Sequence, residues 1–92
     1  MYMLTVYTKD WCGYCTMAKN RLTEWNIPYE EINMDVDKDA RNFIKEQGLN
    51  TAPQIFYNGK LFVSDGADGL MKMSLIEIKE RLGDLDLSDM SL

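Results

Sequence analysis

The chain has 92 residues, which fits one compact domain because domains usually run from about 50 to 250 residues. Its 15 acidic and 10 basic residues give a formal net charge of −5, which argues against nucleic acid or an anionic membrane as a partner. The absence of histidine excludes histidine-based catalytic triads and zinc fingers of the mixed cysteine and histidine type. No apolar run approaches the roughly 18 residues that span a bilayer, and no secretory leader follows Met1, so we expect a cytoplasmic protein.

The first part of the chain predicts a strand, a helix and a second strand. Residues 2–8 are β-branched and aromatic, which favours a strand buried on both faces. Residues 12–26 predict a helix, since small or apolar side chains recur at steps of three and four residues: Cys15, Ala18, Leu22 and Trp25. Pro28 cannot continue this helix, and residues 29–34 then predict a strand.

A second helix and a hairpin are predicted next. The helix begins at a cap formed by Asp35 or Asp37 and ends at Gly48. Its apolar stripe consists of Val36, Ala40, Phe43 and Ile44. Residues 54–57 and 60–63 predict antiparallel strands, because the dipeptide Asn58-Gly59 between them is a strong hairpin signal.

The last part of the chain predicts a turn, a helix and a tail. Gly66 and Gly69 bracket the turn, which leads to a helical stretch, and Ser74-x-x-Glu77 resembles a capping box at which a separate last helix would start and run to Leu82. Residues 1–83 therefore form the expected domain, and the acidic residues 84–92 an unstructured tail.

These elements predict an α/β domain with the order β-α-β-α-β-β-α and a four-stranded mixed sheet. Right-handed crossovers would make the first three strands mostly parallel, with helices covering both faces. Open α/β sheets carry their ligands at the carboxyl ends of the strands, where Cys12 and Cys15 follow the first strand.

Cys12-Gly13-Tyr14-Cys15 contains the chain's two cysteines, at the start of the predicted helix. Two cysteines placed at random would be three residues apart only about 2% of the time. Unpaired backbone N–H groups and the helix dipole favour a thiolate at Cys12, and such settings lower a thiol pKa to about 3.5–7.5. We therefore expect Cys12 to be a nucleophile and Cys15, one turn later, to resolve its mixed disulfide.

Two other interpretations of the cysteines carry less weight. Free cysteines are often only small buried hydrophobic residues, but these two open a helix. A zinc site would need two further cysteine or histidine ligands, which only another chain could supply. We therefore expect no metal site within the chain.

Three segments, Tyr7 to Cys15, Thr51 to Phe56 and Asp65 to Asp68, resemble the signature regions of a dithiol glutaredoxin. This resemblance implies a thioredoxin-like fold that reduces protein disulfides and glutathione mixed disulfides. It also implies glutathione as the co-substrate that regenerates the dithiol, no tightly bound cofactor, a monomeric state, and protein clients such as ribonucleotide reductase.

The resemblance also assigns roles near the cysteines. Cys12 matches the attacking cysteine and Cys15 the resolving one, while Lys9 and Tyr14 match residues that contact glutathione. A solvated lysine and a core tyrosine are the simpler alternatives for Lys9 and Tyr14.

Thr51-Ala52-Pro53 resembles the family segment with a cis proline beside the cysteines, and the Ala52 backbone would bond glutathione or a client peptide as a β-strand does. The simpler alternative is a proline that only opens a strand. Ala67 and Asp68 match the turn that holds the γ-glutamyl group, although Asp65 replaces a glycine of that turn and Gly69 an acid. A further glutathione contact from the middle helix would fall on Ala40, or on the adjacent Arg41.

Two departures from the family pattern support alternative functions. Gly13 stands where proline is most common, and family members without that proline can hold a [2Fe-2S] cluster between two subunits with glutathione. Trp11 is similar to the residue that precedes the motif in thioredoxins, which flavin reductases regenerate. Both alternatives stay open on the sequence.

Overall fold

The computed structural model describes residues 3–63 and 66–82. Along the chain the elements are β1 (Leu4–Thr8), α1 (Gly13–Glu24), β2 (Tyr29–Asn33), α2 (Lys38–Glu46), β3 (Gln54–Tyr57), β4 (Lys60–Leu61), α3 (Gly66–Lys72) and α4 (Leu75–Leu82). The predicted tail, residues 84–92, lies outside the described residues.

The four strands form one mixed sheet in the order β2-β1-β3-β4. β1 and β2 are parallel, with Val6 opposite Glu31. β3 is antiparallel to β1, with Tyr7 opposite Gln54, so the prediction of three mostly parallel strands is wrong. The reason is that the chain leaves α2 at the end of the sheet where β1 ends, so β3 starts there and runs in the opposite direction. The segment before β3 therefore lies at the same end of the sheet as the loop after β1.

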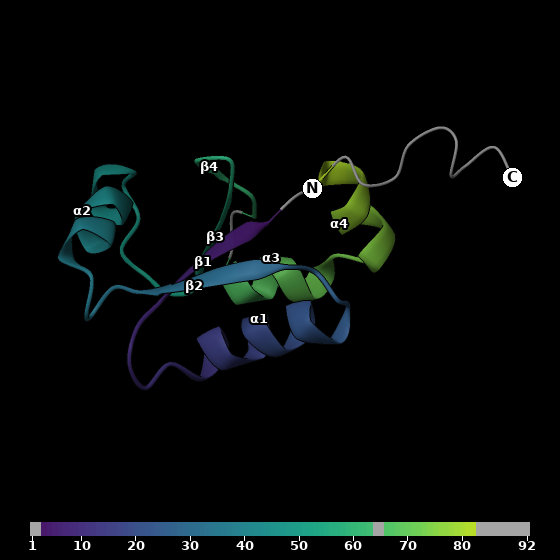
Figure 1. Cartoon of the computed structure of the whole chain (residues 1–92), viewed down its shortest axis with the longest axis horizontal. Coiled ribbons are helices and arrows are strands. Elements are labelled where there is room, and N and C mark those ends of the chain that lie inside the picture. The colour runs from purple at the N-terminus through teal and green to yellow at the C-terminus, as the bar shows by residue number, and fades with distance from the viewer. Residues whose placement is uncertain (1–2, 64–65, 83–92) are drawn as a thin grey trace, which may run out of the picture.

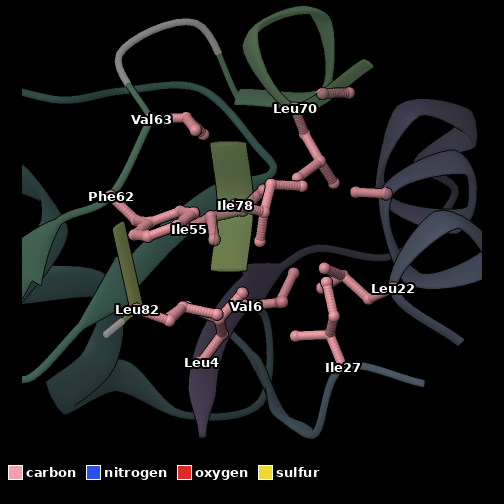
Figure 2. Packing of buried hydrophobic residues seen from close by; sticks show 12 residues of the cluster. Leu4, Val6, Leu22, Ile27, Ile55, Phe62, Val63, Leu70, Ile78 and Leu82 are labelled. Carbon is pink, nitrogen blue, oxygen red and sulfur yellow. The ribbon is translucent and has the colours of Figure 1, made fainter. Parts of the chain in front are cut away.

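Helices cover both faces of the sheet (Figure 1), and each face has its own apolar core. On one face, α1 and α3 lie side by side and pack with α4 around buried residues of β1 and β3, which Figure 2 shows from close by. That cluster includes Leu4, Val6, Leu22, Ile55, Leu70 and Ile78. On the other face, α2 contributes Ala40 and Ile44, which pack around Phe56.

The second face is less completely covered than the first. In β1, Leu4, Val6 and Thr8 are buried, but Thr5 and Tyr7 are only partly buried, so the predicted burial of this strand on both faces is wrong. The physical reason is that α2 covers that face with only a few buried residues. A helix of nine residues is too short to cover the whole strand. Val36, predicted as part of its apolar stripe, precedes the helix and is exposed.

Local sequence signals set several element boundaries. Asn58 and Gly59 both have positive φ values, 52° and 78°, as the predicted tight turn between β3 and β4 requires. β4 is shorter than predicted and ends at Leu61, although the Phe62 N–H still donates to the carbonyl oxygen of Ile55 over 2.8 Å.

The capping box at Ser74 and Glu77 is confirmed, since the Glu77 N–H donates to Ser74 Oγ over 3.1 Å. The predicted turn between Gly66 and Gly69 is instead the first part of α3, and the helical stretch predicted after it is a helix separate from α4. The described residues therefore hold one helix more than the predicted order β-α-β-α-β-β-α. Within residues 3–63 and 66–82, no helix is long and apolar enough to cross a membrane.

Candidate active site

Cys12 is the N-cap of α1, and Cys12 and Cys15 form a disulfide with Cα atoms 5.2 Å apart. The backbone of Cys12 is extended, with φ −112° and ψ 101°, so its side chain turns back over the first turn of the helix. The Cys15 N–H donates to Cys12 Sγ over 3.1 Å. One sulfur thus occupies the position where helix N–H groups and the helix dipole stabilise negative charge.

The two cysteines differ in exposure. Cys15 is 2% exposed and belongs to the buried stripe of α1 with Ala18 and Leu22, whereas Cys12 is only partly buried. Trp11, directly before Cys12, is fully exposed and has a φ of 57°. A partner can therefore reach Cys12 more readily than Cys15.

The segment Thr51 to Pro53 lies beside Cys12. Cys12 Sγ is 3.8 Å from the carbonyl oxygen of Ala52, and the Ala52–Pro53 peptide bond is cis, as the resemblance implies. The buried side chain of Gln54 positions the segment, because its Nε2 donates hydrogen bonds to the carbonyl oxygen and the hydroxyl of Thr51 over 3.0 and 2.9 Å.

A hollow of about 190 Å³ opens on one side of Ala52 and is lined by three cations, Lys9, Arg41 and Lys45. We call it the basic hollow. Its lining carboxylate, Asp35, accepts a 2.7 Å hydrogen bond from the N–H of Asp10. Arg41 rather than Ala40 is the residue of α2 that lines it, since Ala40 is buried against the sheet.

A second hollow, of about 280 Å³, lies on the other side of the same segment. Its lining includes Thr51, Ala52 and Pro53, together with Tyr14, Ala67 and Asp68. We call it the acidic hollow, because Asp68 is its charged residue. Tyr14 is 60% exposed, so the alternative that it is a core tyrosine is excluded.

A third hollow, of about 460 Å³, borders both cysteines, and we call it the cysteine hollow. Glu31 of β2 and Lys19 of α1 line it, and Lys19 Nζ lies 3.1 Å from a carboxylate oxygen of Glu31. Thr8 donates a 2.8 Å hydrogen bond to the same carboxylate and, together with Lys19, lowers the pKa of Glu31.

The geometry combines a helix-capping cysteine, a buried second cysteine and a cis-proline segment within reach of the first. The glutaredoxin family model matches residues 4–62. The chain belongs to the glutaredoxin family. It is a thiol-disulfide oxidoreductase of the glutaredoxin type, and its fold is the thioredoxin-like fold.

Individual relatives agree with the family match. A protein of Mycobacterium tuberculosis described as a glutaredoxin is 35% identical over 78 residues, which cover 82% of this chain and 92% of the relative. Mitochondrial glutaredoxin-2 of Bos taurus is 33% identical over 69 residues, which cover 71% of this chain and 43% of that protein.

Two solved glutaredoxin structures resemble the whole fold. The holo form of glutaredoxin C1 from Populus tremula x tremuloides superposes with a TM-score of 0.70 at 28% identity, covering 88% of this chain and 76% of the other. A buckwheat glutaredoxin–glutathione complex superposes with the same TM-score of 0.70 at 25% identity, covering 92% and 83%.

The residues that the resemblance assigns to the cysteine pair and to glutathione lie together at one end of the sheet, except that Ala40 is buried and Arg41 takes its place. Asp65 lies outside the described residues. Lys9 lines both the basic and the cysteine hollow, Tyr14 and Asp68 line the acidic one, and Ala52 lies between. Sequence reasoning missed Lys45 and Glu31. Spacing offers a signal for Lys45, which stands one helical turn after Arg41. The position of Glu31 depends on the pairing of β1 with β2, for which the sequence holds no local signal.

Proposed function

We propose that the protein is a glutathione-dependent dithiol oxidoreductase that reduces protein disulfides and glutathione mixed disulfides through Cys12 and Cys15. The observation that supports this most is the pairing of the two cysteines at the first turn of α1, with the more accessible one as the N-cap. Because the Cys15 N–H points at Cys12 Sγ, a thiolate on Cys12 is favoured over a thiol after reduction.

Each half of the cycle is an exchange of one sulfur bond for another. The Cys12 thiolate attacks a substrate disulfide, forming a mixed disulfide and releasing one substrate thiolate. Cys15 then gives up its proton and attacks Cys12 Sγ, which forms the Cys12–Cys15 disulfide and releases the second thiolate. Two glutathione molecules restore the dithiol and leave as glutathione disulfide.

The two hollows beside Ala52 suit the two charged ends of glutathione. Lys9 and Arg41 would bind the glycine carboxylate, and Asp68 would pair with the γ-glutamyl ammonium. Ala52 would bond the cysteinyl backbone between them, and Tyr14, Thr51, Pro53 and Ala67 would complete the walls. The buckwheat relative, which was solved as a glutathione complex, supports glutathione as the ligand of this site.

The test is the reduction of a small glutathione mixed disulfide by glutathione, coupled to glutathione reductase and NADPH. We expect turnover by the unchanged protein and loss of at least about 100-fold in Cys12→Ser, because no other thiol has the N-cap position. Turnover that survives Cys12→Ser would refute the nucleophile assignment. Regeneration by a flavin reductase with NADPH, and not by glutathione, would favour the thioredoxin-type alternative.

Ribonucleotide reductase is the protein client that the family resemblance implies. The dithiol would reduce a disulfide of this client completely, because Cys15 resolves the mixed disulfide that forms on Cys12. The direct test is whether the reduced protein, with glutathione as sole reductant, supports turnover of the ribonucleotide reductase of the same organism.

A further inference from the structure

The basic hollow holds more positive charge than the glycine carboxylate of glutathione requires. Lys9 and Arg41 already supply two cations, and Lys45 adds a third from the next turn of α2. Within residues 3–63 and 66–82, none of these three side chains is paired with a carboxylate, so all three are available to a ligand. Asp35, the carboxylate that also lines the hollow, accepts a hydrogen bond from the N–H of Asp10, and its charge leaves the three cations with a net excess of two positive charges.

This local charge runs against the charge of the whole molecule. The chain carries a net charge of −5, yet the wall on one side of Ala52 is cationic, while the charged residue on the other side is Asp68. The two hollows share Thr51 and Ala52, so a strand bonded to Ala52 passes from one into the other. The groove therefore presents a negative end and a positive end to whatever lies across it.

We infer that this groove selects polypeptide clients by the order of the charged residues on the two sides of their reacting cysteine. It favours a basic residue immediately before the cysteine and an acidic residue after it. The direction follows from glutathione, whose glutamyl end would lie against Asp68 and whose glycine end would lie against Lys9 and Arg41. The inference thus rests on the proposed function and extends it from glutathione to a class of protein substrates.

Lys45 is the residue whose substitution should affect peptide clients more than glutathione. A glycine carboxylate ends directly after the cysteine, whereas the longer side chain of glutamate or aspartate, or a further acidic residue, reaches deeper along α2. Ile44 and Leu49 also line the hollow, so apolar surface flanks its three cations. Lys45 is exposed, so its pairing with a client carboxylate is a surface interaction of modest size that salt screens. Because of the longer reach of such a client, Lys45 would act mainly on peptide clients.

The experiment uses two capped peptides of identical composition, one with the order Lys-Cys-Glu and the other with Glu-Cys-Lys, each as a mixed disulfide with a small neutral thiol. Their equal net charge cancels the long-range effect of the acidic protein. We expect kcat/KM to be about 5- to 20-fold higher for Lys-Cys-Glu at low salt, and the ratio to fall toward one as salt is added.

Matched variants test the groove itself. Lys45→Gln should lower the ratio about two- to threefold, and Asp68→Asn should lower it similarly from the other end. Lys38→Gln is the control, because Lys38 is an exposed lysine of the same helix that does not line the hollow. A melting curve for each variant establishes that it is folded.

Equal rates for the two peptides at low salt would overturn the inference, as would a preference that neither Lys45→Gln nor Asp68→Asn changes. Reduction of a glutathione mixed disulfide is measured in parallel. If it proceeds normally while the peptides are not distinguished, the charge selectivity fails and the proposed function stands. If glutathione supports no turnover at all, the proposed function fails.

Discussion

Gly66 at the start of α3 packs directly against the carbonyl group of Pro53. A Cβ atom at Gly66 would lie 2.6 Å from the Pro53 carbonyl oxygen, and the φ of Gly66 is +57°. Both features exclude a side chain at this position. The contact joins α3, which carries Asp68, to the segment beside Cys12, and so fixes the wall of the acidic hollow.

Gly66→Ala should therefore destabilise the protein by about 2–4 kcal/mol, from the unfavourable backbone conformation and the close approach to a backbone oxygen together. The measurement is urea unfolding followed by circular dichroism. Gly13→Ala is the control, because no atom lies within 4 Å of a Cβ there and Gly13 has a helical position. It should be neutral or stabilise by up to about 1 kcal/mol. Equal stabilities of the two variants would contradict the packing role of Gly66.

Cys15→Ser should separate the two reactions of the site. Reduction of a glutathione mixed disulfide should stay within about threefold of the unchanged protein, since Cys12 alone can exchange with glutathione. Reduction of a protein disulfide should fall at least about 100-fold, because the mixed disulfide with the client is not resolved. Mass spectrometry should detect that trapped adduct on Cys12. Full activity on protein disulfides would show that Cys15 is not the resolving thiol.

Glu31→Gln should change the pH dependence of stability. The hydrogen bond from Thr8 and the ion pair with Lys19 lower the pKa of Glu31, so its ionised form stabilises the fold. That contribution is present above the ordinary pKa of the carboxyl group and is lost as the pH falls through the lowered folded-state value. Because Glu31 is exposed to water, we expect only about 0.5–1 kcal/mol near neutral pH.

The measurement for Glu31 is the unfolding free energy of both proteins from neutral to acid pH. The difference should narrow steadily on acidification, since both side chains are then uncharged. Glu30→Gln is the matched control on the same strand, because within the described residues Glu30 has neither the hydrogen bond from Thr8 nor the ion pair with Lys19. A difference for Glu31→Gln that does not vary with pH would contradict the assignment.

Gln54→Leu should impair substrate binding more than stability. The variant loses two hydrogen bonds to Thr51 but also removes the buried Oε1, which has no hydrogen-bond partner within the described residues. We expect the unfolding free energy to change by less than about 1 kcal/mol, because these effects oppose each other. Freed from Gln54, Thr51 should no longer be held at the groove, and KM for a glutathione mixed disulfide should rise about 3- to 10-fold.

For Gln54, the alkylation rate of reduced Cys12 provides the control reading. The alkylation rate should not change, because the hydrogen bonds of Gln54 go to Thr51, whereas Cys12 Sγ lies against the carbonyl oxygen of Ala52. An unchanged KM would mean that Gln54 does not position Thr51 for binding.

The sequence by itself determined the features that depend on neighbouring residues. The placement of Cys12 at a helix start, the tight turn at Asn58-Gly59 and the capping box at Ser74 are all local, because each depends on backbone groups within a few residues. The family resemblance added the cis bond before Pro53, which composition and spacing do not indicate.

Only the tertiary structure decided how these pieces meet. The direction of β3 depends on the end of the sheet at which the chain leaves α2. The antiparallel pairing of Tyr7 with Gln54 then brings Ala52 beside Cys12. The rotation of α2 about its axis decided that Arg41 and Lys45 face the hollow while Ala40 is buried. These outcomes arise from packing between segments distant in sequence, so no local pattern could contain them.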